Sequence, residues 1–294
     1  MARTWKRLAS TLMLALALTG LAAAQAQQAQ QTPPGYTMPS THMFDITSDG
    51  GDIYRIFVSF PATEMPADGY PVLYVLDGNA MFASFAEARR IQEYYEVGKG
   101  IVVGVGYPGD QAYDVRRLDD YTPLLVDPPP PNVRHLAKYK SGGQDKFLDF
   151  LTGKLRTEIS RRYKINADRQ SLFGHSLGGL VALHTLYTRP QAFHSIVAAS
   201  PSLEWNDQSI LKEEREFTAR VLAGKVPRTS RLMVVVGDRD IDDEPGPAAA
   251  FMKRMDALAV HGLRSRFHRY ADEGHMTVPV RAVPDTLRFA FEVH

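Results

Sequence analysis

The stretch that decides the fold is Leu172-Phe173-Gly174-His175-Ser176-Leu177-Gly178-Gly179. Its Gly-x-Ser-x-Gly spacing is that of a nucleophile elbow, a sharp turn that carries a serine from the end of a strand to the start of a helix. Glycines let the strand and the helix pass where a Cβ would not fit. Gln170 to Phe173 favours a short strand, and Leu180 to Tyr187 favours an apolar helix that ends before Arg189-Pro190. The strand, the turn and the helix therefore come in the order that a nucleophile elbow requires. An ordinary glycine-rich turn would not need this order.

The N-terminus has the pattern of an export signal. Arg3, Lys6 and Arg7 precede an apolar stretch from Leu8 to Leu21, which is too short to span a bilayer and is followed by small residues. No cysteine is present, so the sequence offers neither a disulfide nor a lipid attachment site. We expect a periplasmic or secreted protein without a stable membrane anchor, made of a signal peptide at residues 1–26, a polar tether at 27–36 and one domain at 37–294.

Charge is nearly balanced, with 34 Lys and Arg residues against 33 Asp and Glu residues. Removal of the signal peptide would leave a net charge of about −2, which argues against a general nucleic-acid binder. With 294 residues, 44% of them hydrophobic, the chain is long enough to bury a sizeable core.

Hydrophobic patterning predicts an α/β fold. Two alternating runs, His42–Thr47 and Ile53–Phe60, flank a Ser48–Asp52 turn and predict an N-terminal antiparallel hairpin. After it, apolar runs typical of buried parallel strands alternate with helical patterns. The strands are expected at 71–76, 100–105, 170–173, 193–199, 231–236 and 265–270, and the helices at 81–95, 144–163, 180–187, 206–222, 247–261 and 278–293. The pattern predicts a mostly parallel, doubly wound sheet. Residues 106–143 lack periodicity, and we expect them to lie over the active site as a functional loop.

An elbow serine needs a base, and a neutral imidazole suits that task near pH 7. In chains built on this elbow the histidine comes last, on the loop after the last strand. His275 stands at that place, after the strand predicted at 265–270. His175 adjoins the serine in the sequence, but its side chain is expected to point elsewhere.

The acid that would orient the imidazole belongs after the strand predicted at 231–236. A Gly-x-x-Asp spacing there favours Asp240, and Asp238, Asp242 and Glu244 remain alternatives. Two N–H donors are needed for the oxyanion. We expect one from Leu177, directly after the nucleophile, and one from Asn79, after the strand at 71–76.

Two other patterns carry no site. Gly104 to Gly109 matches G-x-G-x-x-G, but it opens no helix, and Pro108 removes an N–H that a phosphate cradle would use. The nine histidines contain no H-E-x-x-H and no i,i+4 pair. The sequence therefore predicts no metal and no cofactor.

These motifs together resemble the esterase branch of the α/β hydrolases, which includes periplasmic enterobactin and salmochelin esterases and the ferri-bacillibactin esterase. The resemblance covers nearly all of the chain after the tether. The segments that carry it are Leu73–Asn79, Gly104–Tyr107, Arg117–Pro123, Ser141–Gly143, Gly174–Gly179, Ala199–Ser202 and Gly274-His275. The four prolines at 128–131 depart from the family's pattern.

The resemblance implies an α/β-hydrolase fold and hydrolysis of a small-molecule carboxylic ester, with a catecholate siderophore trilactone as a candidate substrate. It implies that Ser176 and His275 act in catalysis, with Asp240 available as the acid, and that Leu177 and Asn79 form the oxyanion hole. It also implies that Arg117, or its neighbour Arg116, faces an anionic substrate. A surface ion pair of Arg117 with Asp119 or Asp120 is the alternative. An acyltransferase on the same fold, or a non-catalytic ligand-binding homologue, are the alternatives for function.

Overall fold

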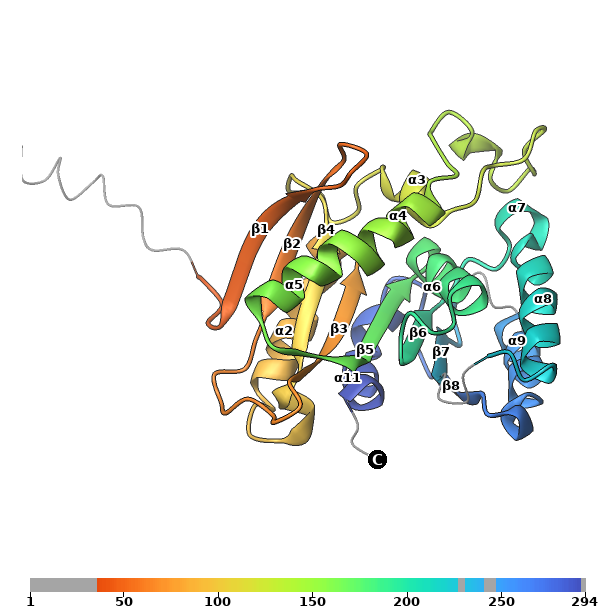
Figure 1. The fold of residues 1–294 in the computed structure, drawn as a ribbon. Helices are drawn as coiled ribbons and strands as arrows, with labels where there is room; N and C mark the ends of the chain where they lie inside the picture. Colours follow the sequence, from red (N-terminus) through yellow and green to blue (C-terminus); the bar gives the residue numbers. More distant parts are fainter. Residues whose placement is uncertain (1–35, 227–230, 241–246, 292–294) are drawn as a thin grey trace, which may run out of the picture. The chain divides into compact units, whose positions relative to one another are not determined.

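The apolar runs pair into one eight-stranded sheet in the computed structural model of the chain, which describes residues 36–226, 231–240 and 247–291 (Figure 1). The strand order is β1-β2-β4-β3-β5-β6-β7-β8. The strands are β1 (Thr41–Thr47), β2 (Ile53–Ser59), β3 (Tyr70–Leu76), β4 (Ile101–Gly106), β5 (Ile165–His175), β6 (Ser195–Ala199), β7 (Arg231–Gly237) and β8 (Arg264–Tyr270).

The predicted N-terminal hairpin is confirmed. β1 and β2 are antiparallel, and the turn between them closes with the Ser48 N–H donating to the Asp52 carbonyl at 2.7 Å. β2 also runs antiparallel to β4, whereas every pairing from β4 to β8 is parallel. All the parallel strands therefore end at one edge of the sheet, where the loops that follow them gather.

Helices cover both faces of the sheet (Figure 1). The connection from β3 to β4 runs along the sheet in one direction, and the later connections between parallel strands run in the other. Because such connections are right-handed, the helix between β3 and β4 lies on one face of the sheet and the helices of the later connections lie on the other. Contacts agree, since α2 packs with α11 and α6 packs with α8. The first face carries α2 (Gly78–Arg90), α10 (Val278–Arg281) and α11 (Val283–Phe291), and the second carries α4 (Gln144–Phe150), η3 (Leu151–Leu155), α5 (Arg156–Arg162), α6 (Leu177–Thr188), α8 (Ile210–Leu222) and α9 (Pro247–Asp256). The short helical segments are η1 (Glu96–Lys99), α3 (Arg117–Tyr121), η2 (Arg134–Leu136), α7 (Trp205–Gln208) and η5 (Ala259–His261).

Several predicted helices differ at their ends. The helix expected at 144–163 contains a π-helical turn at Leu151–Leu155. The helix expected at 206–222 starts only at Ile210, because Asn206 to Gln208 have positive φ. The helix expected at 278–293 is two helices, and Pro284 near the start of the second cannot donate a backbone hydrogen bond across the break.

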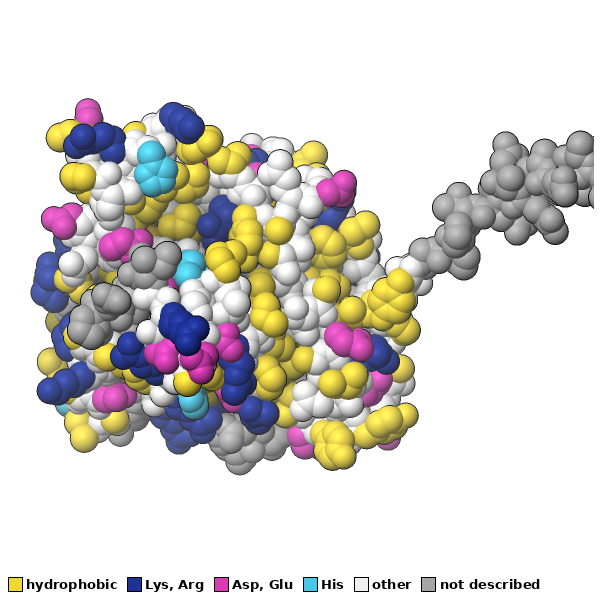
Figure 2. All heavy atoms as spheres, turned by 180° about the vertical axis from the view of Figure 1, so that it is seen from behind, with side chains coloured by type: hydrophobic (Ala, Val, Ile, Leu, Met, Phe, Trp, Pro, Cys, Tyr) yellow, Lys and Arg dark blue, Asp and Glu magenta, His cyan; other side chains and the backbone are white. Residues whose placement is uncertain are grey.

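The compact unit that contains the sheet begins at Ser40. The predicted signal peptide and nearly all of the tether lie outside the described residues. Within the described part of the chain, none of the helices is both long and apolar enough to cross a membrane. On the face seen in Figure 2, basic and acidic side chains are interspersed and form no single basic stripe.

The elbow is a strained turn, as predicted. Ser176 has φ 58° and ψ −118°, outside the regions that L-residues favour. Its N–H donates to the Ala199 carbonyl at 2.9 Å, which ties the turn to the end of β6. A Cβ added at Gly174 would lie 2.0 Å from the Gly178 carbonyl oxygen. The backbones of β5 and α6 thus approach too closely for any side chain at residue 174.

We predict that Gly174→Ala lowers the free energy of unfolding by about 3 kcal/mol or more, because the clash is between backbone atoms that cannot rotate away. The matched control is Gly153→Ala, where nothing lies within 4 Å of the added Cβ. There we expect a gain of about 0.4–1 kcal/mol from the lower entropy of the unfolded chain. Urea denaturation of both variants measures the difference, and equal stabilities would contradict the close approach at the elbow.

Candidate active site

The carboxyl edge of the sheet collects the candidate residues from strands far apart in the sequence. Ser176 follows β5, Ser202 lies just past β6, Asp240 follows β7, and His275 lies on the loop after β8. The long segment between β4 and α4 lies above the same edge (Figure 1). The topology therefore places residues that lie up to 99 positions apart at the same edge of the sheet.

A cavity of about 540 Å³ opens at Ser176. This volume is within the usual range for small-molecule sites. The segment between β4 and α4 forms much of its wall, as expected for residues 106–143. The residues that line it are Gln111, Tyr113, Asp114, Val115, Arg117, Leu118, Asn132, Val133, His135, Leu136, Ser176, Leu177, Ser202, Glu204 and Trp205.

His275 and Asp240 form a hydrogen-bonded pair. His275 Nδ1 donates to Asp240 Oδ1 at 2.8 Å, and the Asp240 side chain is only 1% exposed. A proton held at Nδ1 leaves Nε2 as the acceptor, the form that a general base needs. Of the alternative acids, Asp238 is exposed, and Asp242 and Glu244 lie outside the described residues.

The loops after β7 and β8 are joined by their backbones. The Asp238 N–H donates to the Tyr270 carbonyl and the Arg239 N–H donates to the Glu273 carbonyl, both at 3.0 Å. These bonds join the two loops just before Asp240 in one loop and just before His275 in the other. The distance between the acid and the imidazole is therefore set by the sheet and does not depend on two independent loops.

The side chain of His175 lies against the loop that carries His275, a contact that the sequence reasoning did not predict. Its Nε2 donates to the backbone carbonyl of His275 at 2.8 Å, and the two rings lie 4.7 Å apart. Burial, together with the neighbouring His275, lowers the pKa of His175 to about 3. A neutral imidazole thus fixes the His275 backbone. Only the folding of the β8 loop over the elbow reveals this contact, which no spacing in the sequence signals.

Two backbone N–H groups expected at the oxyanion hole stand at helix N-termini. Leu177 is the first residue of α6, and Asn79 is the second residue of α2. N–H groups in the first turn of a helix have no acceptor within that helix. The Asn79 side chain is used elsewhere, since its Oδ1 accepts from the Tyr107 N–H at 2.8 Å and its Nδ2 donates to the Tyr107 carbonyl at 2.9 Å. At Asn79, the backbone N–H is therefore the group to consider as an oxyanion donor.

Arg117 lines the cavity with its charge already compensated. Its Nε and Nη2 donate to the two carboxylate oxygens of Asp77 at 2.8 and 2.9 Å, and the Asp77 side chain is 1% exposed. Although burial alone would lower the pKa of Arg117, the Asp77 carboxylate raises it above its ordinary value. The ion pair considered from the sequence was with Asp119 or Asp120, and the structure places a different carboxylate there.

Arg116 lies outside this cavity. Its guanidinium stacks on the Tyr107 ring at 4.6 Å and donates to the Ile53 carbonyl at 3.0 Å. It lines a different, smaller pocket beside Asp120. The structure therefore brings Arg117, and not Arg116, to Ser176.

Helix α3, which begins at Arg117, is held in place through the partly buried carboxylate of Asp120. Asp120 accepts hydrogen bonds from Tyr54 at 3.1 Å and from Tyr107 at 2.9 Å. Burial raises the pKa of Asp120 to about 6, although the two tyrosine hydroxyls act to lower it. The wall of the cavity is thereby fixed to β2 and to the end of β4.

Ser202 is a residue that the sequence reasoning did not assign to the site. Its Oγ lies 3.3 Å from Ser176 Oγ. The Ser-Pro-Ser sequence at 200–202 was visible only as part of the family resemblance. Nothing in its spacing from Ser176 indicates that the two hydroxyls meet.

Comparison with known proteins identifies the family of the chain. The model of the "Putative esterase" family matches residues 50–278. The chain belongs to this esterase family. Ferri-bacillibactin esterase BesA of Bacillus subtilis is 34% identical over 270 residues, which cover 88% of this chain and 92% of that protein. A siderophore triacetylfusarinine C esterase of Aspergillus fumigatus is 37% identical over 193 residues, 63% of each chain.

Solved structures of similar proteins have the same fold as this chain. The BES protein of Bacillus cereus superposes with a TM-score of 0.79 at 30% identity, covering 90% of this chain and all of that one. The siderophore hydrolase EstB of Aspergillus nidulans gives a TM-score of 0.70 at 30% identity, covering 88% and 98%. The fold is the predicted α/β-hydrolase fold, and family membership places the chain among the hydrolases of carboxylic esters.

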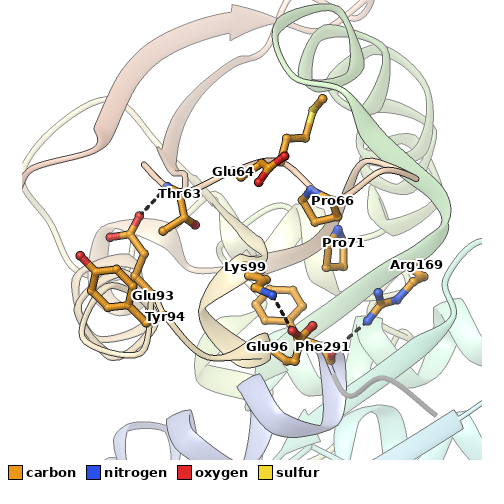
Figure 3. A pocket seen from close by; sticks show the side chains of 11 residues that line it. Thr63, Glu64, Pro66, Pro71, Glu93, Tyr94, Glu96, Lys99, Arg169 and Phe291 are labelled. Atoms are coloured by element: carbon orange, nitrogen blue, oxygen red, sulfur yellow. Dashed lines mark hydrogen bonds and ion pairs between the residues drawn. The ribbon is translucent and has the colours of Figure 1, made fainter.

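A second cavity of this esterase, about 420 Å³, lies near the amino ends of β3, β4 and β5, whereas Ser176 follows the carboxyl end of β5. Figure 3 shows the side chains that line this cavity. Several of the polar side chains that line it bond within the fold. Arg169 donates to the Phe291 carbonyl at 2.9 Å, Lys99 pairs with Glu96, and Glu93 accepts from the Thr63 N–H. These mutual bonds favour a structural role for this cavity.

We predict that His175→Gln reduces the acid sensitivity of the fold. His175 has a pKa of about 3 in the folded chain against an ordinary 6.5, so between these values the unfolded state binds more protons and acid destabilises the protein. Between pH 7 and pH 4.5 this group should cost the wild type about 2–3 kcal/mol. Glutamine keeps an N–H donor for the His275 carbonyl but does not titrate. Urea denaturation at both pH values tests this, and an equal loss in both proteins would contradict it.

Proposed function

We propose that this protein is an exported serine esterase that hydrolyses a siderophore ester through an acyl-enzyme. The observation that carries the proposal is the His275–Asp240 pair at the same sheet edge as the strained Ser176 turn and its cavity. The names of the relatives, which include siderophore esterases from a bacterium and a fungus, support the substrate class.

In the proposed reaction, Ser176 Oγ attacks the ester carbonyl carbon while its proton passes to Nε2 of His275. The carbonyl π pair moves onto oxygen, and the tetrahedral intermediate then expels the alcohol, which takes the proton from His275. A water molecule gives its proton to the same nitrogen and attacks the acyl-enzyme, and Ser176 recovers its proton as the acid leaves. Asp240 keeps the imidazole in the required tautomer and stabilises the imidazolium.

The oxyanion would be held by the backbone N–H groups of Leu177 and Asn79. Both are first-turn donors of long helices, so the positive ends of the α6 and α2 dipoles add to their effect. One such donor is typically worth about 2.7–4 kcal/mol in the transition state.

Arg117 would contact the substrate through hydrogen bonds more than through net charge. Asp77 already compensates its charge, and the bonds given to Asp77 and to the His175 carbonyl use Nε and Nη2. Nη1 is the atom we assign to a carbonyl or catecholate oxygen of the substrate.

Export is proposed from the sequence alone, on the basic residues and the apolar stretch of residues 1–26. Periplasmic or secreted esterases would meet a siderophore after it has entered from outside the cell or as it leaves. Cleavage after residue 26 can be read directly from the N-terminus of the protein recovered from the exported fraction.

We predict that Ser176→Ala abolishes hydrolysis of 4-nitrophenyl acetate and of a catecholate trilactone, by about 10⁵–10⁶-fold in kcat, because the nucleophile is lost. The variant should unfold at the same urea concentration as the wild type. Turnover retained by this variant would contradict the assignment. Adding an alcohol acceptor and finding ester products in place of the free acid would identify an acyltransferase.

We predict that Asp240→Asn lowers kcat by about 10³–10⁴-fold, because an amide can favour the wrong tautomer of His275. The control is Asp238→Asn, two residues earlier and exposed, which should leave kcat within about twofold of wild type. Steady-state kinetics at pH 8 compares the two. Equal kcat values for both variants would remove Asp240 from the mechanism.

A further inference from the structure

Two hydroxyl groups meet at the floor of the cavity. Ser202 Oγ lies 3.3 Å from Ser176 Oγ, and both residues line the same cavity. Ser202 is buried, with 4% of its surface exposed, so solvent competes little for its hydroxyl. A buried hydroxyl at this distance forms a hydrogen bond with the nucleophilic oxygen unless the hydroxyl proton points away from that oxygen.

The backbone holds the two serines at this distance. The Ser202 N–H donates to the Ser176 carbonyl at 3.2 Å, and the Ser176 N–H donates to the Ala199 carbonyl at 2.9 Å. The loop after β6 is thus bound to the elbow by main-chain bonds that do not involve either hydroxyl. Removing the Ser202 hydroxyl therefore leaves its loop bound to the elbow.

The proposed reaction, together with the tautomer of His275, assigns the donor in the contact between the two serines. Nδ1 of His275 carries its proton toward Asp240, so Nε2 is an acceptor. In the proposed reaction Ser176 gives its own proton to that nitrogen, which leaves only lone pairs on Ser176 Oγ for other partners. The contact with Ser202 is then a bond from the Ser202 O–H to Ser176 Oγ.

We propose that Ser202 is a positioning residue that donates a hydrogen bond to the nucleophilic oxygen throughout the reaction, an inference that rests on the proposed function. One lone pair of Ser176 Oγ accepts from Ser202, and the other forms the bond to the carbonyl carbon. Oγ becomes an ester oxygen in the acyl-enzyme and leaves with the bonding pair during deacylation, when it takes back the proton from His275. The Ser202 proton stays on its own oxygen, so no proton is gained or lost through this residue.

This arrangement has two consequences. The bond restricts the rotamer of Ser176 so that its oxygen faces the substrate, and it stabilises negative charge on that oxygen when it is attacking or leaving. Both effects act on the chemical step and not on substrate affinity. The loss of the hydroxyl should therefore appear in kcat and in the reactivity of Ser176, with KM for substrate little changed.

Ser200 provides a matched control in the same loop. It is buried to the same extent, with 4% exposed, and among the described residues no hydrogen-bond partner reaches its Oγ. Ser200→Ala and Ser202→Ala thus remove the same atom from the same loop, but only one of them removes a bond to Ser176. Ser202→Thr keeps the hydroxyl and serves as the conservative replacement.

The experiment measures the rate at which a fluorophosphonate inactivates each variant, together with kcat and KM for 4-nitrophenyl acetate. We expect Ser202→Ala to lower the inactivation rate and kcat by about three- to tenfold, the worth of one neutral hydrogen bond. We expect Ser200→Ala to match the wild type and Ser202→Thr to stay within about twofold of it. Urea midpoints of the three variants should agree, which a merely structural role of the hydroxyl would not produce.

The proposal is overturned if Ser202→Ala matches Ser200→Ala in both rates, or if Ser202→Thr falls as far as Ser202→Ala while folding normally. It is also overturned if Ser202→Ala raises KM while both kcat and the rate of inactivation by the fluorophosphonate stay unchanged, because the hydroxyl would then contact substrate and not the nucleophile. A wild-type protein that neither turns over esters nor reacts with the fluorophosphonate would instead refute the proposed function. The two failures are thus distinguishable in one set of measurements.

Discussion

The close passage of β5 against α6 at residue 174 is the constraint on which the site depends. It leaves room for no side chain there and forces Ser176 into a positive φ, which costs free energy that the surrounding fold must offset. The offset comes from the burial of α6, whose residues from Leu177 to Tyr187 are all shielded from solvent. The strain points the serine away from the strand and leaves the first N–H groups of α6 available to a substrate.

Hydrogen bonds join the loops around this turn to one another. Most of the site residues are therefore held by contacts from more than one loop. Arg117 bridges the ends of β3 and β5 through Asp77 and the His175 carbonyl. His175 in turn bridges the elbow to the β8 loop. A buried ion pair such as that of Arg117 with Asp77 is weak evidence for stability, because desolvation opposes its attraction. Its evident result here is to fix the cavity wall.

Much of the fold followed from pattern. Continuous apolar runs predicted the parallel strands, alternation predicted the hairpin, and the elbow predicted the strand-turn-helix order around Ser176. Helix ends were less accurate, as at Asn206 to Gln208, where left-handed backbone interrupts a sequence with ordinary helical spacing. Such breaks arise from contacts made only in the folded chain; Asn206, for example, holds the segment at 124–126 with two side-chain hydrogen bonds.

For the site, sequence order was enough to select Ser176, His275 and Asp240 as candidates, because the topology of the fold assigns each to a given loop. Sequence order did not show the roles of residues whose bonding partners lie far away in the sequence. The partner of Arg117, the contact of His175 with the His275 backbone, and the approach of Ser202 to Ser176 each join loops from different strands. The sequence by itself determined which residue types stand at the ends of which strands. Only the tertiary structure decided which side chains meet, because those distances depend on strand order and on how the loops fold over the sheet edge.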